Sequence, residues 1–385
     1  MKNKFIAKRY QEDGSTAMGQ SDMLAKSFDD VIDLSLGDPD MTTPKPIIDA
    51  AYEAMVEGHT KYTDFRGDPE LRAAIIDQYR EDYSMEIADE EIFVAASGCL
   101  AMYLVLEAII DDGDEVLMQS PYFTPYPQQV ELARGIPVEL PTYEDEDFQV
   151  DPNRLESLIT DRTKAIIINS PNNPTGSCLS IETMRKIAEI ADKHDLVVIS
   201  DEIYTAFSFE HPFVPFASLP GMRERTVTIN SFSKNFVMTG WRLGNIIAPP
   251  DIISVIQQIN ENVVFTAPSM SQRAGIYALQ HRHELQQPIT EEFRNRMNYA
   301  AQRINDISGM SVIYPPKGSF YLFPNIKKTG LTSEEVSSLL LSKAHVLTLP
   351  GSAFGACGEG HIRICCTVSI EKLKEAFDRI EAALK

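Results

Sequence analysis

The sequence carries little positive charge for its length. Its 385 residues include 35 Lys and Arg against 56 Asp and Glu, which gives a formal net charge of −21 at pH 7. Proteins that bind nucleic acids or anionic membranes concentrate Lys and Arg on the surface that meets the phosphates. The composition therefore predicts that neither nucleic acid nor a membrane is a partner.

Long apolar runs are also missing. Runs such as Ala165–Ile168 and Leu196–Ile199 have the length of strands, whereas a spanning helix needs about 18 or more apolar residues. Residues 1–10 are too polar to form the apolar core of a secretory signal peptide. We therefore predict a cytoplasmic protein.

Cysteine is scarce, and several catalytic motifs are absent. The five cysteines are odd in number and follow no metal-ligand spacing, which predicts free thiols and no metal site. No Walker A lysine, His-Glu-x-x-His pair or Gly-x-Ser-x-Gly elbow is present, and this excludes the enzyme classes that depend on them. The cysteines are Cys99, Cys178, Cys357, Cys365 and Cys366.

The sequence does contain short Val- and Ile-rich runs that alternate with helical segments. Several runs are apolar on consecutive residues, which is typical of strands buried on both faces of a parallel sheet. The fold class is therefore predicted to be α/β with a mostly parallel sheet. The predicted strands are Ile92–Ala96, Glu115–Gln119, Ile136–Leu140, Ala165–Asn169, Leu196–Ser200, Thr226–Asn230 and Gly244–Ala248.

The helical segments show start signals, and the pattern changes near the C-terminus. Asp68-Pro69 and Asp151-Pro152 each place an N-cap residue before a proline, and Thr332 to Glu335 has the capping-box spacing. After about residue 285, two long helical patterns flank short strands. We predict a large α/β domain at 43–285 and a smaller α+β domain built from 1–42 together with 286–385.

Residues capable of chemistry follow several successive strands. Ligands of parallel α/β sheets bind outside the carboxyl ends of the strands, so these residues are expected to share one crevice. Each segment alone also fits a turn or a helix cap. The segments are Ser97-Gly98-Cys99, Ser120 to Phe123, Asn169 to Gly176, Asp201 to Tyr204, and Ser231 to Lys234.

Six motifs in chain order resemble the class I and II aminotransferases, which are fold-type I enzymes that use pyridoxal 5′-phosphate (PLP). The resemblance covers nearly the whole chain and implies the PLP-dependent transferase fold type I, with a homodimer whose active sites are shared. The motifs are Leu34 to Asp40, Lys61 to Thr63 with Gly67 to Arg72, Ser170 to Gly176, Asp201 to Tyr204, Ser231 to Lys234 with Gly240 to Gly244, and His361 to Arg363.

The resemblance implies catalytic roles for three residues. Lys234 matches the lysine that holds PLP as a Schiff base and then moves the substrate proton. Asp201 matches the acid paired with the pyridine nitrogen, and Tyr204 matches a phenol that, together with Asn173, hydrogen-bonds the phenolate oxygen of the cofactor. Tyr122 matches the aromatic residue that stacks on the ring.

The resemblance also implies how the phosphate and the substrate are bound. Arg363 matches the arginine that clamps the α-carboxylate, assisted by Asn173 and by the backbone near Gly37. Tyr62 matches a residue that reaches the phosphate of the neighbouring subunit. The remaining predicted phosphate ligands are Ser97, Gly98, Cys99, Ser231, Ser233 and Arg242.

Departures from the family pattern bear on substrate choice. Cys99 stands where some relatives selective for acidic substrates have a basic residue, which argues against aspartate specificity by that route. Arg66 is either a second cation near the substrate or a solvated or salt-bridged surface residue. Phe123, Phe320 and Tyr321 fit either an apolar side-chain pocket or the core.

The predicted function is transfer of an α-amino group from an amino acid to a 2-oxo acid. One alternative on the same fold is a PLP-dependent C–S β-lyase of the cystathionine type. Such lyases usually carry a Trp-containing segment where this chain has Leu36 to Asp40. The second alternative, a ligand-sensing regulator, is disfavoured because every catalytic position is filled.

Overall fold

A seven-stranded sheet forms the centre of the larger part of the molecule. The computed structural model describes residues 4–7, 26 and 28–385, and the strand order of this sheet is β2-β8-β7-β6-β5-β3-β4. Six strands run in the same direction, and only β8 runs opposite to them. All seven predicted strands are confirmed, with ends shifted by one or two residues. They are β2 (Ile92–Ala95), β3 (Glu115–Ser120), β4 (Ile136–Pro141), β5 (Thr163–Asn169), β6 (Val197–Asp201), β7 (Thr226–Ser231) and β8 (Gly244–Ile247).

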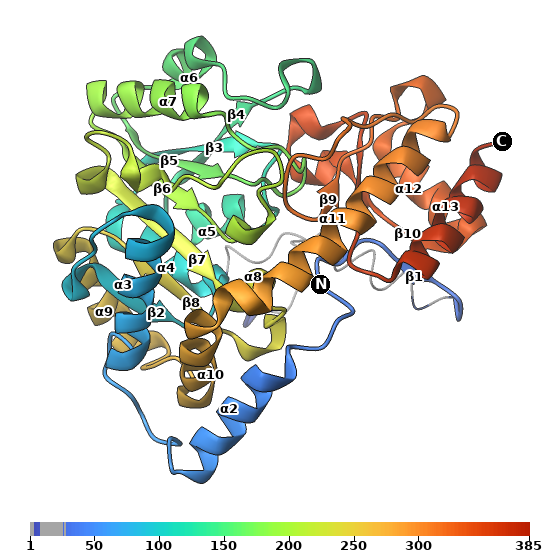
Figure 1. Cartoon of the computed structure of the whole chain (residues 1–385). Coiled ribbons are helices and arrows are strands. Elements are labelled where there is room, and N and C mark those ends of the chain that lie inside the picture. Colours follow the sequence, from blue (N-terminus) through green and yellow to red (C-terminus); the bar gives the residue numbers. More distant parts are fainter. Residues whose placement is uncertain (1–3, 8–25, 27) are drawn as a thin grey trace.

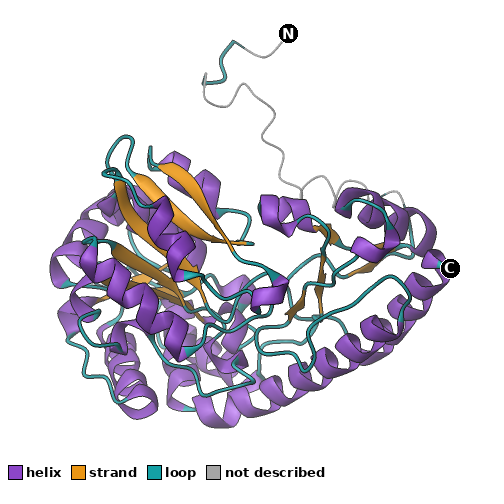
Figure 2. Cartoon of the chain, turned by 90° about the horizontal axis from the view of Figure 1, so that it is seen from above, coloured by secondary structure: helices purple, strands orange, loops and turns teal. Residues whose placement is uncertain are grey.

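Helices cover both faces of this sheet, as the two perpendicular views show (Figure 1, Figure 2). The helices of this larger part are α2 (Lys45–Val56), α3 (Pro69–Tyr83), α4 (Gly98–Ile109), α5 (Tyr126–Leu132), α6 (Pro152–Leu158), α7 (Ile181–Lys193), α8 (Phe232–Asn235), α9 (Pro250–Val263) and α10 (Ser269–Gln280). In β5, Ala165 and Ile167 pack in one buried cluster with α4, α5 and α9, while Ile166 and Ile168 pack with α6 and α7. Burial on both faces explains why this strand is continuously apolar.

The three predicted helix starts are confirmed. Asp68 accepts a hydrogen bond from the backbone N–H of Glu70 at 2.9 Å, and Asp151 accepts one from Asn153 at 2.9 Å. The Thr332 hydroxyl accepts from the N–H of Glu335, whose carboxylate accepts from the N–H of Thr332 at 2.8 Å. These caps satisfy backbone donors that the first helical turn leaves unpaired.

A smaller unit packs beside the large one and contains two small sheets. β1 (Ile32–Asp33) pairs in parallel with β10 (Val346–Leu347), and the antiparallel order of the other sheet is β11-β12-β9. Its remaining elements are β9 (Tyr321–Leu322), β11 (Leu349–Pro350), β12 (Ile362–Cys365), α11 (Arg282–Asp306), α12 (Ser333–Leu339) and α13 (Ile370–Leu384). Helix α11 connects the two units (Figure 1) and begins before the predicted boundary at 285/286. The exact division into domains stays a prediction.

The parallel strands bring their last residues to one edge of the large sheet. Asn169 and Asp201 lie opposite each other in register at the ends of β5 and β6, and β7 ends beside them at Ser231. Asp201 and Ser231 are thus the final residues of their strands rather than loop residues. Among the described residues, no helix has both the length and the hydropathy that crossing a membrane requires.

Candidate active site

A cavity of about 250 Å³ lies at this edge of the sheet, where the small unit meets the large one. Every predicted site residue except Tyr62 and Tyr122 lines it. The structure thus brings together groups that are up to several hundred positions apart in the sequence. The lining residues are Leu36, Gly37, Ser97, Gly98, Cys99, Phe123, Asn169, Asn173, Asp201, Ile203, Tyr204, Ser231, Ser233, Lys234, Thr239, Arg242, Tyr321 and Arg363.

Lys234 lies in α8, one turn after the end of β7. Its amine donates to the backbone carbonyl of Gly37 and lies 5.7 Å from the centre of the Phe320 ring. Desolvation in the cavity lowers the pKa of Lys234 to about 8; the nearby Arg363 and Arg242 act in the same direction, while Asp38 opposes them. A substantial fraction of this amine is therefore neutral, and so nucleophilic, near physiological pH.

Asp201 presents a buried carboxylate to the same cavity. Burial raises the pKa of Asp201 to about 6, although hydrogen bonds from Tyr126 and from the N–H of Ile203 oppose the rise. The acid is 4% exposed. An ionised carboxylate here has a strong preference for a cationic N–H partner, which a protonated pyridine nitrogen supplies.

The N-terminus of α4 forms an anion-binding end of the cavity. Ser97 is the N-cap, and its hydroxyl accepts from the N–H of Leu100 at 3.2 Å, so the first N–H groups of the helix remain available. A Cβ on Gly98 would come within 3.0 Å of the Ile203 side chain and 3.5 Å of Ser231, so glycine keeps this approach open. The guanidinium of Arg242 lines the same cavity.

Arg363 on β12 is a buried guanidinium with a free donor. Nη1 donates to Oδ1 of Asn173 at 3.0 Å and Nη2 donates to the carbonyl of Ser35, but Nε is buried without a partner. The guanidinium carbon Cζ of Arg363 lies 4.8 Å from the ring centres of both Tyr321 and Phe354. A buried N–H donor without a partner is rare in folded proteins, and a bound ligand is one explanation for it.

Three contributors were missed or underrated by the sequence analysis. The Tyr321 hydroxyl hydrogen-bonds that of Tyr204 at 3.1 Å, and Asn169 Oδ1 accepts from the backbone N–H of Asn173 at 2.8 Å. Tyr126 donates to Asp201. No local motif marks the contacts of Tyr321 and Tyr126, because their partners lie 117 and 75 residues away in the chain. Asn169 acts on Asn173, only four residues further on, and was therefore the most accessible from the sequence.

The predicted stacking role of Tyr122 is not supported by its position. Phe123 lines the cavity instead, while the Tyr122 hydroxyl donates to Glu139 at 3.3 Å. Adjacent residues after a strand point in different directions, so the sequence left the assignment one residue in error. Tyr62 lies outside the cavity of its own chain, is 78% exposed, and packs against Phe265 with ring centres 4.7 Å apart.

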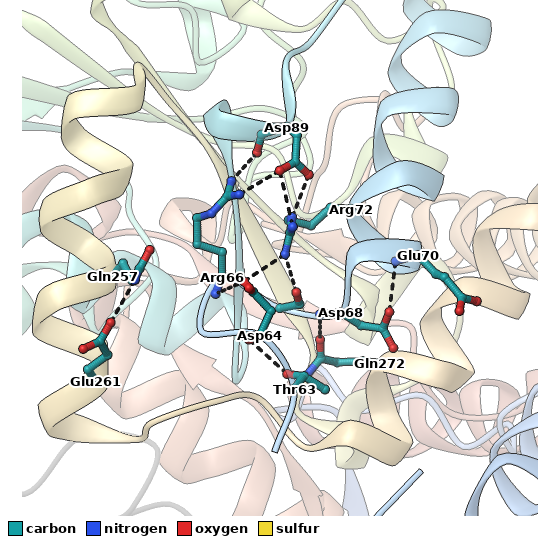
Figure 3. Close-up of polar contacts among 11 residues, drawn as sticks. Thr63, Asp64, Arg66, Asp68, Glu70, Arg72, Asp89, Gln257, Glu261 and Gln272 are labelled. Carbon is teal, nitrogen blue, oxygen red and sulfur yellow. Dashed lines mark hydrogen bonds and ion pairs between the residues drawn. The ribbon is translucent and has the colours of Figure 1, made fainter. Parts of the chain in front are cut away.

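Arg66 does not reach the cavity. Its guanidinium pairs with the Asp89 carboxylate at 2.7 Å and donates to the Asp89 carbonyl at 2.6 Å (Figure 3). Arg72 shares the same carboxylate and also bonds Asp64 at 3.1 Å. The salt-bridged interpretation of Arg66 is therefore the one that the structure supports, and no second substrate cation comes from this loop within the chain.

The residues present fit the cofactor that the resemblance implies. PLP needs an amine for its aldehyde, an acid for its ring nitrogen, donors for its phosphate and an aromatic neighbour for its ring face. The cavity offers Lys234, Asp201, the α4 N-terminus with Arg242, and Phe123. Arg363, which also lines the cavity, offers a cationic group for a carboxylate of the substrate.

Comparisons with known proteins agree with this chemistry. The family model described as aminotransferase class I and II matches residues 29–380. An aspartate aminotransferase of Pyrococcus horikoshii is 40% identical over 367 residues, which cover 94% of this chain and 92% of the relative. An aromatic-amino-acid aminotransferase 2 of Thermococcus litoralis is 39% identical over 366 residues, covering 94% of each chain.

Solved structures give the same result. The aromatic aminotransferase from Pyrococcus horikoshii OT3 superposes with a TM-score of 0.90 at 40% identity, covering 94% of this chain and 98% of that one. The aspartate aminotransferase from Thermus thermophilus with maleate gives 0.92 at 31% identity, covering 98% and 99%. These relatives are named as aminotransferases, so the C–S lyase alternative is not favoured. The chain belongs to the class I and II aminotransferases and is a PLP-dependent enzyme that transfers amino groups from amino acids to 2-oxo acids.

Proposed function

We propose that this aminotransferase holds PLP covalently through Nζ of Lys234 and prefers amino donors with a neutral side chain. The observation that carries the first part is one cavity that holds an amine with a pKa lowered to about 8, the buried acid Asp201 and the N-terminus of α4. The second part rests on which cations of the cavity remain free after the cofactor and the α-carboxylate are bound.

PLP, when bound, supplies a protonated aromatic ring that accepts the electron pair left when the substrate Cα loses its proton. Asp201 keeps that ring protonated because an ionised, buried carboxylate stabilises a cationic N–H beside it. Tyr204 stays protonated, since burial raises its pKa far above the ordinary value, and so it acts as a hydrogen-bond donor. With Asn173 it is placed to bind the phenolate oxygen.

Lys234 is the proposed base. When its amine is not bonded to the cofactor, the amine has a pKa of about 8, is neutral above that pH and would take the Cα proton onto Nζ. The carbonyl of Gly37 accepts a hydrogen bond from this amine and so limits where it can point. A buried lysine loses charge readily, which arginine in the same place would not do.

Arg363 is the proposed clamp for the α-carboxylate. Its Nε donor is unpaired, Asn173 Oδ1 accepts from Nη1, and the rings of Tyr321 and Phe354 hold the guanidinium from two directions. Each Nη carries a second N–H, so a planar guanidinium held this way keeps donors that can bind a carboxylate. The contact between Arg363 and the α-carboxylate orients the substrate, because it holds one of the substituents of Cα in place.

The remaining part of the cavity favours a neutral side chain. In the described residues its cations are Lys234, Arg242 and Arg363, and the roles above engage all three. Leu36, which is 45% exposed, and Ile203 add apolar surface. A second carboxylate, such as that of aspartate, would be buried without a free cation of this chain, which is costly.

We further propose a cytoplasmic homodimer in which Tyr62 contacts the phosphate bound to the partner subunit. Tyr62 is 78% exposed and lies outside its own cavity, and its ring packs against Phe265, which in turn contacts Phe65; all three rings are exposed. Exposed aromatic residues that cluster on one surface are typical of an interface. The dimer is implied by the family resemblance, and the compartment is proposed from the free cysteines.

The test is a half-reaction screen of the PLP-loaded enzyme. Phenylalanine, tyrosine, leucine, aspartate and cystathionine are each mixed with it, and loss of the visible absorbance of lysine-bound cofactor is followed. We expect phenylalanine, tyrosine and leucine to react with higher specificity constants than aspartate. A higher constant for aspartate would refute the proposed preference, and release of pyruvate and ammonia from cystathionine would refute aminotransfer as the main reaction.

A further inference from the structure

A tyrosine outside the predicted set contacts the acid of the site. Tyr126 is the first residue of α5 and is 2% exposed, and its hydroxyl donates to Oδ2 of Asp201. The other carboxylate oxygen accepts from the N–H of Ile203 at 3.3 Å, which is a long hydrogen bond. In the described part of the chain, Tyr126 is thus the one side chain that donates to this carboxylate.

The hydroxyl of Tyr126 can act only as a donor toward Asp201. Burial raises the pKa of Tyr126 far above its ordinary value, and the neighbouring carboxylate raises it further, so the phenol keeps its proton. A hydrogen bond from a neutral donor stabilises the ionised form of an acid. It also occupies Oδ2, so that Oδ1 is the oxygen with capacity for a strong additional bond.

The same helix also contacts the phosphate end of the cavity. Gln129 lies one turn after Tyr126, and its Nε2 donates to the carbonyl of Cys99 at 2.8 Å, at the start of α4. Residues three apart in a helix share a face, so α5 contacts the acid of β6 and the first turn of α4 together. The Phe123 ring packs edge-on against Tyr126 with centres 5.6 Å apart. Tyr126 is therefore held on several sides.

We propose that Tyr126 is a positioning residue that keeps Asp201 ionised and aims its Oδ1 oxygen at the ring nitrogen of the cofactor. The proposal rests on the role of Asp201 given above. One proton is shared between the carboxylate and the ring nitrogen. Withdrawal of charge from the carboxylate by Tyr126 makes Asp201 the weaker base of the two, so the proton stays on the ring, where it is needed for the electron-accepting chemistry.

The test uses Tyr126→Phe, which removes the hydroxyl and keeps the ring volume. The variant is loaded with PLP labelled with ¹⁵N in the ring, and the nitrogen chemical shift is recorded across pH 6–9. In the natural enzyme we expect the shift of a protonated ring nitrogen. In the variant we expect a shift toward the unprotonated value, and a fall in kcat of about tenfold to hundredfold, the size expected for a hydrogen bond to a charged group, with KM little changed.

Two further variants serve as controls. Tyr79→Phe removes the hydroxyl of another buried tyrosine, in α3 and outside the cavity, and should leave the ¹⁵N shift and kcat unchanged. Asp201→Asn should give an unprotonated ring nitrogen. If Asp201→Asn leaves the nitrogen protonated, the proposed role of Asp201 itself is wrong, whatever Tyr126 does.

The decisive outcome concerns Tyr126 alone. If Asp201→Asn deprotonates the ring nitrogen while Tyr126→Phe keeps the natural ¹⁵N shift, Tyr126 has a merely structural role and the proposal is overturned. Cofactor binding, followed through quenching of the single tryptophan Trp241, measures whether Tyr126→Phe folds and binds PLP. Should that variant fail to bind PLP, Tyr126→His, which retains a ring donor, supports the proposal if it restores the protonated shift and contradicts it if it does not.

Discussion

Replacing Asp201 with asparagine is expected to stabilise the cofactor-free protein at neutral pH and to remove its activity. Burial raises the pKa of this acid from 3.8 to about 6. When the folded-state pKa lies above the unfolded one, ionisation costs more in the folded state. The stability contributed by the protonated acid is therefore complete below pH 3.8 and is lost as the pH rises through about 6.

The size of the effect follows from the pKa difference. Each unit corresponds to about 1.4 kcal/mol, so a rise of about two units lowers the free energy of unfolding by about 3 kcal/mol at pH 8 and by about 1 kcal/mol at pH 4.5. Asparagine has no charge to bury, and its amide oxygen still accepts from Tyr126. For a chain of this length the unfolding entropy is about 0.8 kcal/mol/K, so the gain at pH 8 corresponds to a rise in Tm of about 4 °C.

The assay is thermal unfolding of the cofactor-free natural protein and of Asp201→Asn at pH 4.5 and 8. We expect the stabilisation to be larger at pH 8. Glu202→Gln is the matched control, because that neighbouring acid is 1% exposed, has its pKa raised to about 7 by burial and lies outside the cavity. It should also stabilise at high pH but keep activity. Equal stabilisation by Asp201→Asn at both pH values, or none, would refute the reasoning.

Four further outcomes are expected. Lys234→Ala should abolish the visible absorbance of lysine-bound cofactor in purified protein, and a retained band would exclude Lys234 as the anchor. In the natural protein, the rate of PLP incorporation into the cofactor-free form should rise with pH with a midpoint near 8, because only the neutral amine of Lys234 attacks the PLP aldehyde. A rate that stays the same from pH 6.5 to 9.5 would contradict the lowered pKa of Lys234. Arg363→Lys should raise KM for the amino donor at least tenfold with little change in the PLP dissociation constant, measured by tryptophan quenching, whereas equal losses would show that Arg363 is structural. Tyr62→Phe should weaken the binding of PLP more than the binding of unphosphorylated pyridoxal. Equal weakening of both would argue against a contact between Tyr62 and a phosphate.

Much of the fold was predictable because its signals are local. The continuous apolar run of β5 reports burial on both faces within a few residues, and Asp68 and Asp151 mark helix starts through bonds to residues two positions away. Strand ends were less well predicted, since Asp201 and Ser231 complete β6 and β7 by pairing with other strands. Hydrogen bonding between strands is not encoded in either strand alone.

The sequence predicted most of the residues that line the site but not all of the contacts between them. Lys234, Asp201 and Arg363 stand in motifs that sequence comparison recognises, and all three line the cavity. The choice between Tyr122 and Phe123 depends on the backbone direction after β3, which no pattern of residue types specifies. The pairing of Arg66 with Asp89 joins positions 23 residues apart and likewise required the folded chain.

The sequence by itself determined the order of chemical groups along the chain and, through parallel strands, the edge at which they meet. It also determined the acidic net charge, which says nothing about the sign of the site. Only the tertiary structure decided that Arg363 meets Asn173 across 190 residues and that Tyr126 donates to Asp201 across 75. Those contacts arise because folding excludes water from the cavity, and a buried charge is stable only beside a partner that the packing of distant segments provides.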